Sequence, residues 1–507
     1  MPSPNIIGGQ KKIASNTIFL YLRLLITIAV SLYTARIVLD KLGVENYGIY
    51  NIVGSIVVSF VFINNALMSA IQRYYSYHIG LGNSCKRVFS MSINLQILLG
   101  LIVVLLLETL GLWVFKYHLN IPAEREHAAL IVYQLSIATF VVNFIRIPYQ
   151  ALIIAKEKMS AFAYFSIIEV VLKLVIVYLL VYLNYDKLIL YGWLVLAVTI
   201  IVNSLYIIYC KCNFHDCHYH FNKDASLFRE MIGFTSWNFI GGLAGAIRNE
   251  GPNYLLNLFL GVQVNAGMGI AKQVSGTAYN FSSSFQSAFN PQIVKSYAAK
   301  EYDYLYTLIF RTTKISFFLI YIIAIPIIFC DDLFKLWLTV VPPYTRSFCN
   351  CFLIAEIISS ITSPLWMTAH AIGNIRRYQL TLSLLNIMII PIAYILLYMN
   401  AQPYWVVASL IIINIGILIY RVEYLRKRIN MDCNGYYQLV LKLLFVVPLL
   451  TIPIIWGISI FCNGLWGILI LGLLSLLINC SVFYLYALDK EEKDFIKKIL
   501  KRYLIKQ

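Results

Sequence analysis

Charged side chains interrupt several long apolar stretches of this chain. Arg23 and Arg36 lie in the first stretch, and Glu169 and Lys173 lie in another. A charge at the centre of a membrane helix costs roughly 2.5 to 3.5 kcal/mol on insertion scales, so such residues normally face a water-filled cavity. The embedded charges therefore predict a substrate route through a membrane.

Cations outnumber acids in this embedded set. The cations predicted to line the cavity and bind the substrate are Arg23, Arg36, Lys173, Arg248 and Lys272. The acids, which could couple transport to an ion or pair with the cations, are Glu169, Glu250 and Glu356. A surplus of cations suits an anionic ligand, and the planar fork of arginine matches phosphate oxygens. The predicted ligand is therefore a phosphate-bearing molecule.

A purely structural role is the alternative for each of these charges. Glu169 can pair with Lys173, which lies one helical turn later, and Arg248 and Glu250 can pair with one another. Arg36 and Lys314 can instead extend from helix ends to the membrane interface. The sequence alone leaves both interpretations open.

The composition places these charges in a polytopic membrane protein. Of the 507 residues, 60% are hydrophobic and 12% are charged, whereas about a quarter of residues are charged in a soluble domain. The apolar stretches have the length of membrane helices, about 20 residues, which predicts an all-α fold. We expect about 14 transmembrane helices: 17–38, 47–68, 89–115, 128–149, 162–182, 188–209, 232–259, 264–289, 308–329, 348–371, 380–399, 404–424, 439–461 and 465–488.

The net charge of +17 does not predict a nucleic-acid partner. The lysines and arginines gather in alternate loops, as the positive-inside rule requires of a membrane protein. The distribution predicts cytoplasmic N and C termini in a bacterial cytoplasmic (inner) membrane. The first apolar stretch reads as an uncleaved helix because it is interrupted by arginine and no small-residue cleavage site follows.

The sequence predicts no cofactor, no metal site and no catalytic residues. Cys210, Cys212, Cys217 and the histidines between 215 and 220 share one loop, but their spacing matches no paired zinc pattern. There is no glycine-rich lysine loop for ATP, and the outward loops are short. We therefore expect a transporter and not an enzyme.

An internal duplication organises the chain. Pro148 matches Pro364, and Leu42-Gly43-Val44 recurs as Leu260-Gly261-Val262 at nearly the same offset in residue number. An even number of helices separates the matching points, so the two halves should have the same orientation. The predicted domains are two six-helix lobes at 1–215 and 216–430, an extra transmembrane helix pair at 431–488 and a basic amphipathic cytoplasmic tail at 489–507.

Two segments resemble a known transporter family. Residues 14–17 (Ala-Ser-Asn-Thr) and 42–51 (Leu-Gly-Val-Glu-Asn-Tyr-Gly-Ile-Tyr-Asn) resemble the start of polysaccharide-biosynthesis flippases. Residues 248–300, with Asn253-Tyr-Leu-Leu and Asn290-Pro-Gln-Ile-Val-Lys-Ser-Tyr, are similar to the seventh and eighth helices of the same group. These are the O-antigen flippases of the multidrug/oligosaccharidyl-lipid/polysaccharide superfamily.

The resemblance implies a V-shaped bundle that moves an undecaprenyl-diphosphate-linked oligosaccharide to the outer leaflet by alternating access. It implies that cavity cations, with Arg23 and Arg248 as the best matches, engage the diphosphate. It also implies that the lipid bilayer, a polysaccharide polymerase and other assembly proteins are candidate partners. The extra helix pair is similar to that of the lipid II flippases, which keeps lipid II open as the substrate.

A cation-coupled exporter of small drugs remains an alternative from the same superfamily. Such an exporter should have acidic cavity residues for cationic substrates, whereas the first apolar stretch has Arg23 and Arg36. An assembly scaffold or membrane enzyme for surface polysaccharide is a third interpretation. A scaffold should tolerate neutral residues at Arg23 and Arg248.

Overall fold

The fold was analysed in a computed structural model of the full chain. The backbone is described from residue 4 to residue 494, apart from 81–83, 157, 184, 221–224, 331, 373–375 and 463. Side chains are described within these ranges except at 4–25, 65–66, 69, 73, 76–77, 80, 159, 225–227, 230, 233–238, 240, 287–288, 291–292, 295 and 298. Residues 495–507 of the predicted amphipathic tail, including Phe495 and Tyr503, thus lie outside the described residues.

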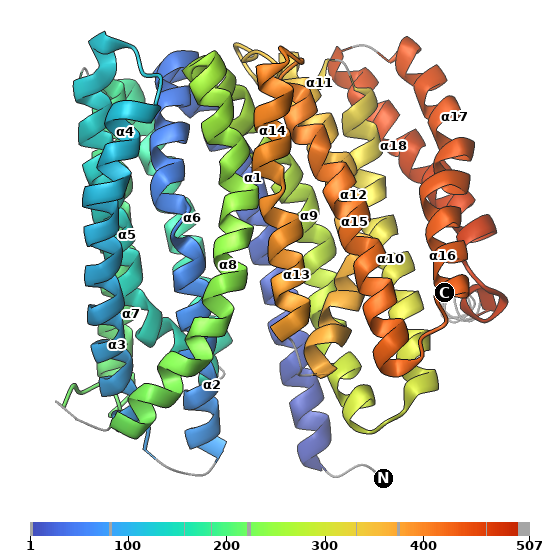
Figure 1. The fold of residues 1–507 in the computed structure, drawn as a ribbon, viewed down its shortest axis with the longest axis horizontal. Helices are drawn as coiled ribbons and strands as arrows, with labels where there is room; N and C mark the ends of the chain where they lie inside the picture. The colour runs from blue at the N-terminus through green and yellow to red at the C-terminus, as the bar shows by residue number, and fades with distance from the viewer. Residues whose placement is uncertain are drawn as a thin grey trace. The chain divides into compact units, whose positions relative to one another are not determined.

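The chain divides into two compact units, Met1–Gly269 and Ile270–Gln507. Both units are built from helices, and no strand occurs among the described residues, which confirms the all-α fold (Figure 1). The helices of the first unit are α1 (Pro4–Val58), α2 (Val61–Gly80), α3 (Lys86–Leu106), α4 (Leu112–His118), α5 (Glu126–Ala155), α6 (Met159–Tyr182), α7 (Lys187–Asn213) and α8 (Ala225–Leu260). A π-helical turn, η1 (Leu107–Gly111), joins α3 to α4.

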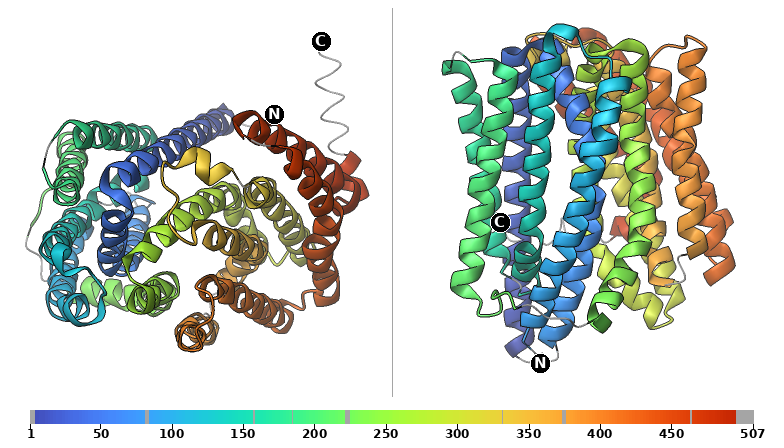
Figure 2. Two further views of the ribbon diagram at one scale, coloured as in Figure 1. Left: turned by 90° about the horizontal axis from the view of Figure 1, so that it is seen from above. Right: turned by 60° about the vertical axis from the view of Figure 1, so that its left-hand side comes forward.

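The helix α9 (Val262–Ala298) crosses from the first unit into the second. The other helices of the second unit are α10 (Tyr302–Phe329), α11 (Leu333–Trp337), α12 (Thr345–Ile372), α13 (Arg376–Ile387), α14 (Ile389–Tyr398), α15 (Tyr404–Ile429), α16 (Cys433–Leu441), α17 (Val447–Phe461) and α18 (Gly464–Val482). The π-helical turns η3 (Lys442–Val446) and η4 (Phe483–Ala487) extend α16 and α18. Figure 2 shows that the long helices within each unit run side by side.

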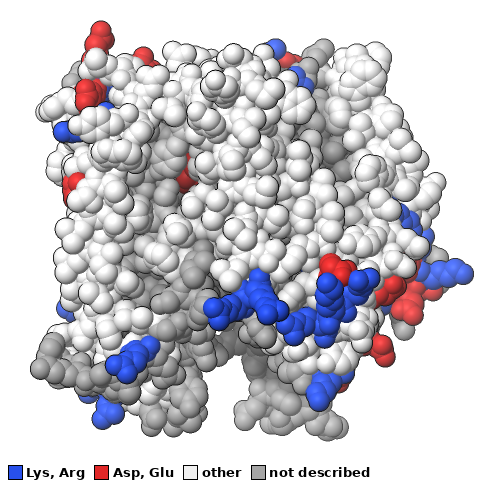
Figure 3. Space-filling view, viewed as in Figure 1, with Lys and Arg blue, Asp and Glu red and all other residues white. Residues whose placement is uncertain are grey.

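Ten helical stretches of the described chain are long and apolar enough to cross a membrane. Each coincides with one of the spans predicted from the sequence. The other four predicted spans fall in α1, α2, α8 and α9, which are helical and are only partly described at the level of side chains. A total of 14 transmembrane helices is therefore compatible with the structure. On the face shown in Figure 3, the charged side chains gather in groups, and a broad band of the surface beside them has almost no charge. Such an uncharged band is expected of a surface that faces lipid.

One long helix forms the centre of each unit. In the first unit α5 packs against α7, α2 and α1, and in the second unit α12 packs against α15 and α10. In the apolar window of α12, 67% of the residues are buried, against 17% in the window of α3 to α4. α12 is therefore an inner helix, whereas α3 and α4 turn most of their apolar side chains to the surroundings.

Left-handed glycines occur at both copies of the repeated Leu-Gly-Val sequence. Gly43 has φ 77° and ψ 164° and interrupts the helical geometry of α1, and Gly261 has φ +80° between α8 and α9. Residues with a Cβ rarely adopt these angles. The duplicated glycines therefore place a sharp turn at corresponding points of the chain.

Polar side chains set other helix ends. The carboxylate of Asp186 accepts hydrogen bonds from the backbone of Leu188 (3.0 Å) and Ile189 (3.3 Å), so that α7 begins directly after it. Asn430 adopts the left-handed conformation that ends α15.

Candidate functional site

The five cations predicted to bind substrate come from four helices. Arg23 lies in the part of α1 whose side chains are outside the described residues, and Arg36 is exposed further along that helix. Lys173 is exposed on α6, whereas Arg248 on α8 is half-buried. Lys272 is half-buried on α9 and belongs to the second unit.

Lys173 belongs to a charged cluster within the first unit. Its ammonium lies 2.8 Å from a carboxylate oxygen of Glu169, one turn earlier on α6. The other carboxylate oxygen of Glu169 lies 3.7 Å from the guanidinium of Arg146 on α5. That guanidinium also lies 5.2 Å from the ring centroid of Tyr206 on α7, within cation–π range. The cluster therefore joins three helices and carries two cations for one acid.

The remaining sequence candidates are not isolated charges. Arg248, Glu250, Lys272 and Glu356 are all half-buried, and each has a polar or electrostatic partner within the chain. Glu250 lies close enough to Tyr254, one turn later on α8, to interact with its hydroxyl. These side chains are thus held by the protein before any ligand binds.

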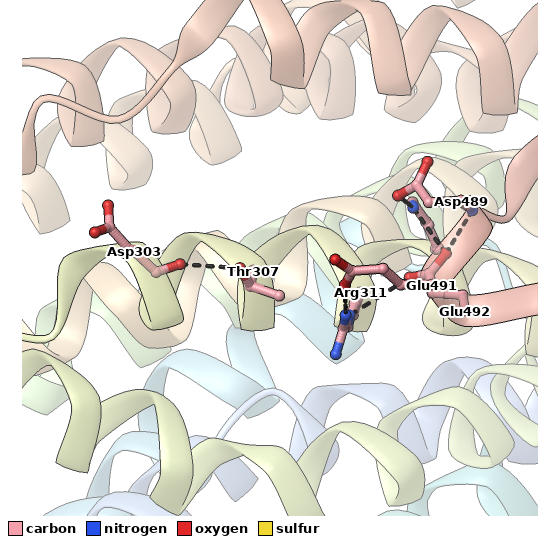
Figure 4. A network of polar contacts seen from close by, with 7 residues as sticks. Asp303, Thr307, Arg311, Asp489, Glu491 and Glu492 are labelled. Atoms are coloured by element: carbon pink, nitrogen blue, oxygen red, sulfur yellow. Dashed lines mark hydrogen bonds and ion pairs between the residues drawn. The ribbon is translucent and has the colours of Figure 1, made fainter. Parts of the chain in front are cut away.

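The most buried charge of the described chain is Lys314 on α10, whose side chain is 5% exposed. Its ammonium donates to Asp489 and, at 3.0 Å, to Glu492, both in the segment that follows α18. Arg311, one turn earlier, lies 3.1 Å from Glu491 (Figure 4). The backbone N–H of Asp489 also donates to Glu492 at 2.9 Å. Lys314 therefore forms an ion pair within the second unit and does not extend to the interface as a lone charge.

The sequence did not single out Arg421, although it is a half-buried charge on α15. Its guanidinium donates to the carbonyl of Thr362 at 3.0 Å and to the hydroxyl of the same residue at 2.8 Å. Its Nε atom is buried without a hydrogen-bond partner. The sequence could have indicated this residue, because Arg421 is a charged side chain near the end of the apolar stretch 404–424.

Each unit contains a cavity that is lined by described residues. A cavity of about 170 Å³ in the first unit is lined by uncharged residues, including Tyr50, Asn64, Thr139 and Asn143. A cavity of about 780 Å³ in the second unit lies between α10 and the end of α18, and Phe318, Phe483 and Arg311 are among the residues that line it. Ligand pockets usually measure about 300 to 1,000 Å³, so only the second has room for a large molecule.

The loop after α7 carries an acid–base contact. Asp216 lies 2.8 Å from the ammonium of Lys156 and 2.9 Å from the hydroxyl of Ser84. Although partial burial opposes ionisation of Asp216, these hydrogen bonds lower the pKa of its carboxyl.

Within the described part of the chain, no three histidine, cysteine or acidic side chains are arranged to hold a metal ion.

Solved structures share this fold. The chain is similar to the lipid II flippase MurJ in its inward closed conformation, with 14% identity, a TM-score of 0.68 and coverage of 93% of this chain and 99% of that one. It is also similar to an inward-facing multidrug resistance MATE family transporter, with 14% identity, a TM-score of 0.63 and coverage of 82% and 98%. This chain has the fold of MOP superfamily transporters. A MOP transporter from Pyrococcus furiosus, described by the reverse polarity of its binding pocket, matches with 15% identity, a TM-score of 0.60 and coverage of 82% and 95%.

Among the comparisons with known proteins, only the solved structures identify the MOP fold. No family model matches the chain. No curated protein matches it either. Identities of 14% to 15% establish the architecture, whereas substrates vary among proteins that share one fold.

Proposed function

We propose that this MOP-fold protein is a flippase for an undecaprenyl-diphosphate-linked oligosaccharide, a repeat unit of O-antigen, capsule or another surface polysaccharide. It carries the lipid from the cytoplasmic to the outer leaflet of a bacterial cytoplasmic membrane. The diphosphate binds cations of the cavity, the sugars cross in water and the prenyl tail remains in lipid. The lobes 1–215 and 216–430 rock against each other to alternate access.

The observation that carries this proposal is the excess of cations on membrane helices of a transporter fold. The predicted span 17–38 contains Arg23 and Arg36 and no acid. Arg248 and Lys272 add half-buried cations on α8 and α9, and Arg146 and Lys173 share the single acid Glu169. Such a set favours a phosphate-bearing substrate over the cationic drugs that an acidic cavity would select.

The charge of the substrate also supplies a driving force. A lipid diphosphate with two negative charges is driven outward by an inside-negative potential at about 2.3 kcal/mol per charge per 100 mV, or about 4.6 kcal/mol in total. Export of the anion can therefore proceed without a nucleotide.

Lipid II is a second candidate substrate because of the C-terminal helices. The match to the lipid II flippase covers 93% of this chain, whereas the match to the MATE transporter covers 82%. The two apolar stretches after the second lobe, Cys433–Phe461 and Gly464–Ala487, contain 29 and 24 residues. A helix pair of this length is large enough to account for the wider match to the lipid II flippase.

Translocation in proteoliposomes tests the proposal. The substrates are fluorescent undecaprenyl-diphosphate oligosaccharide and fluorescent lipid II, and the variants are Arg23→Gln and Arg248→Gln. Lys335→Gln is a matched control, since Lys335 is 75% exposed on the short helix α11 and has one weak ion pair at 3.9 Å.

We expect wild type and Lys335→Gln to flip the lipid-linked oligosaccharide at the same rate, and both other variants to flip it at least tenfold more slowly. Faster flipping of lipid II than of the oligosaccharide would select the second candidate. Normal flipping by Arg23→Gln and Arg248→Gln would refute the cation site. Export of a small organic cation with no flipping of either lipid would replace the proposed function with drug export.

A further inference from the structure

The central helix of each unit contains a proline in its interior. Pro148 lies within α5 and Pro364 lies within α12. Proline has no N–H, so it cannot donate to the carbonyl four residues earlier. The carbonyls that lose this donor are those of Phe144 and Ser360. A buried carbonyl without a donor is costly at membrane depth, where water is excluded.

In the first unit a glutamine from another helix replaces the missing donor. The Nε2 atom of Gln96 on α3 donates to the carbonyl of Phe144. Gln96 is only 5% exposed, so its amide lies deep between α3 and α5. Its hydrogen bond is directed to the one carbonyl that Pro148 has freed.

In the second unit a different helix provides the equivalent donor. The Nε2 atom of Gln286 on α9 donates to the carbonyl of Ser360 at 3.2 Å. The Oε1 atom of this amide accepts from the hydroxyl of Ser363 at 2.5 Å, which fixes the orientation of the amide. Gln286 is 4% exposed. The two glutamines are closer together in sequence than the two prolines, so the donors are not copies of each other in the duplication.

We propose that Gln96 and Gln286 are positioning residues that hold the proline-interrupted segments of α5 and α12 in their transport-competent geometry. Each amide replaces the one backbone donor that the proline removes. A second helix is thereby tied to the point where the central helix is weakest. Neither glutamine needs to contact the substrate, and their effect on flipping rests on the proposed function.

A double-substitution experiment tests the pairing without any substrate. Gln96→Leu removes the donor to Phe144, and the Tm of the purified protein should fall by about 2–5 °C. Pro148→Ala restores a backbone N–H for the same carbonyl. In the Pro148→Ala background, Gln96→Leu should therefore lower the Tm by less than half of that amount. Gln286→Leu with Pro364→Ala should behave in the same way.

Crossed pairs provide the control for general destabilisation. The Tm changes of Gln96→Leu with Pro364→Ala, and of Gln286→Leu with Pro148→Ala, should be additive. In each crossed pair the alanine restores a backbone donor to the carbonyl of the other unit. Equal additivity in the matched and crossed pairs would overturn the proposal. So would an unchanged Tm in both single glutamine variants.

Flipping assays then separate positioning from substrate binding. Each glutamine variant should reduce the maximal flipping rate several-fold and leave the KM for the lipid unchanged, since no substrate ligand is lost. A raised KM at constant maximal rate would place the amide in the binding site and overturn the positioning role. If wild type flips no lipid, the proposed function fails, but the Tm experiment still decides the pairing.

Discussion

The pairs α5–α7 and α12–α15 occupy corresponding places in the two units, yet they are joined by different bonds. In the first unit, Asn203 on α7 reaches Asn143 on α5 at 3.4 Å, and the thiol of Cys210 donates to the carbonyl of Tyr149 at 3.5 Å. In the second unit, the corresponding Asn414 donates to the carbonyl of Ala355 at 2.7 Å. The guanidinium of Arg421 takes the place of the thiol, since each residue lies two turns after the asparagine of its own helix.

The backbone near Pro364 therefore has more donors than the backbone near Pro148. Gln286 bonds Ser360, and the hydroxyl of Tyr436 on α16 donates to the next carbonyl, that of Ile361, at 2.9 Å. Arg421 bonds the one after that, Thr362. The comparison shows that an embedded cation can donate hydrogen bonds to backbone carbonyls of its own protein. We infer that the second unit is stiffer around its proline than the first.

Substitution of the buried lysine should show the largest difference between the units. Lys314→Met removes the cation from Asp489 and leaves Glu492 with Arg311 at 3.7 Å, and we expect a loss of about 2–4 kcal/mol in the free energy of unfolding, because the lost ammonium is buried whereas Asp489 is largely exposed to solvent. Lys173→Met should cost less, because the side chain of Lys173 is 54% exposed and that of Lys314 only 5%. Chemical denaturation in detergent measures both. Equal losses would remove this distinction between the two ion clusters.

The next largest effect compares Arg421 of the second unit with Cys210, the thiol at the corresponding position of the first. Arg421→Leu removes two charge-assisted hydrogen bonds to Thr362 and should cost about 1.5–3 kcal/mol. Cys210→Ala, at the corresponding position, removes one weak thiol bond and should cost less than about 1 kcal/mol. The same denaturation experiment compares them, and a costlier Cys210→Ala would reverse our view of which unit is stiffer.

The two glycine turns should respond alike. Gly43→Ala and Gly261→Ala each force a side chain into positive φ, which costs about 1–2 kcal/mol. A Cβ at Gly43 would meet no atom within 4 Å, and one at Gly261 would meet only the amide of Asn120 at 3.9 Å, so backbone strain is the main cost. Losses that differ by more than about 1 kcal/mol would show that the repeated turns are not equivalent.

The smallest effect is a pH dependence confined to the first unit. The pKa of Asp216 is lowered in the folded protein, so its contact with Lys156 stabilises the fold above the unfolded pKa of about 3.9. This contribution is lost as the pH falls through the lower, folded pKa. The Tm difference between wild type and Asp216→Asn should therefore be constant from pH 7 to about pH 5 and shrink in stronger acid. A difference that grows in acid would contradict this assignment.

The sequence was sufficient for the architecture because helix-length apolar stretches and left-handed glycines are local signals. All ten membrane-length apolar helices found among the described residues coincide with predicted spans, and the glycines of both Leu-Gly-Val copies form turns. The fold of the MOP superfamily was also anticipated, from the resemblance of short segments. The sequence could not distinguish O-antigen from lipid II, since both are diphosphate lipids and call for the same cations.

The partners of the embedded charges were harder to predict. Glu169 and Lys173 pair because they lie one turn apart on one helix, which the sequence allowed as an alternative. The partners of Lys314 are 175 and 178 residues away in sequence, and the amide of Gln96 meets a carbonyl 48 residues away. Such contacts depend on helix packing. The roles of Arg23, Arg36, Arg248 and Lys272 in binding substrate stay predictions.

The most direct test of the central claim is the dependence of flipping on membrane potential. Proteoliposomes with an imposed inside-negative potential would receive the same fluorescent oligosaccharide on an undecaprenyl diphosphate or on an undecaprenyl monophosphate. A substrate anion bound by the embedded cations should flip outward faster as the potential increases, and the diphosphate should gain more because it carries more charge. Flipping that is independent of potential and equal for the two lipids would contradict the account.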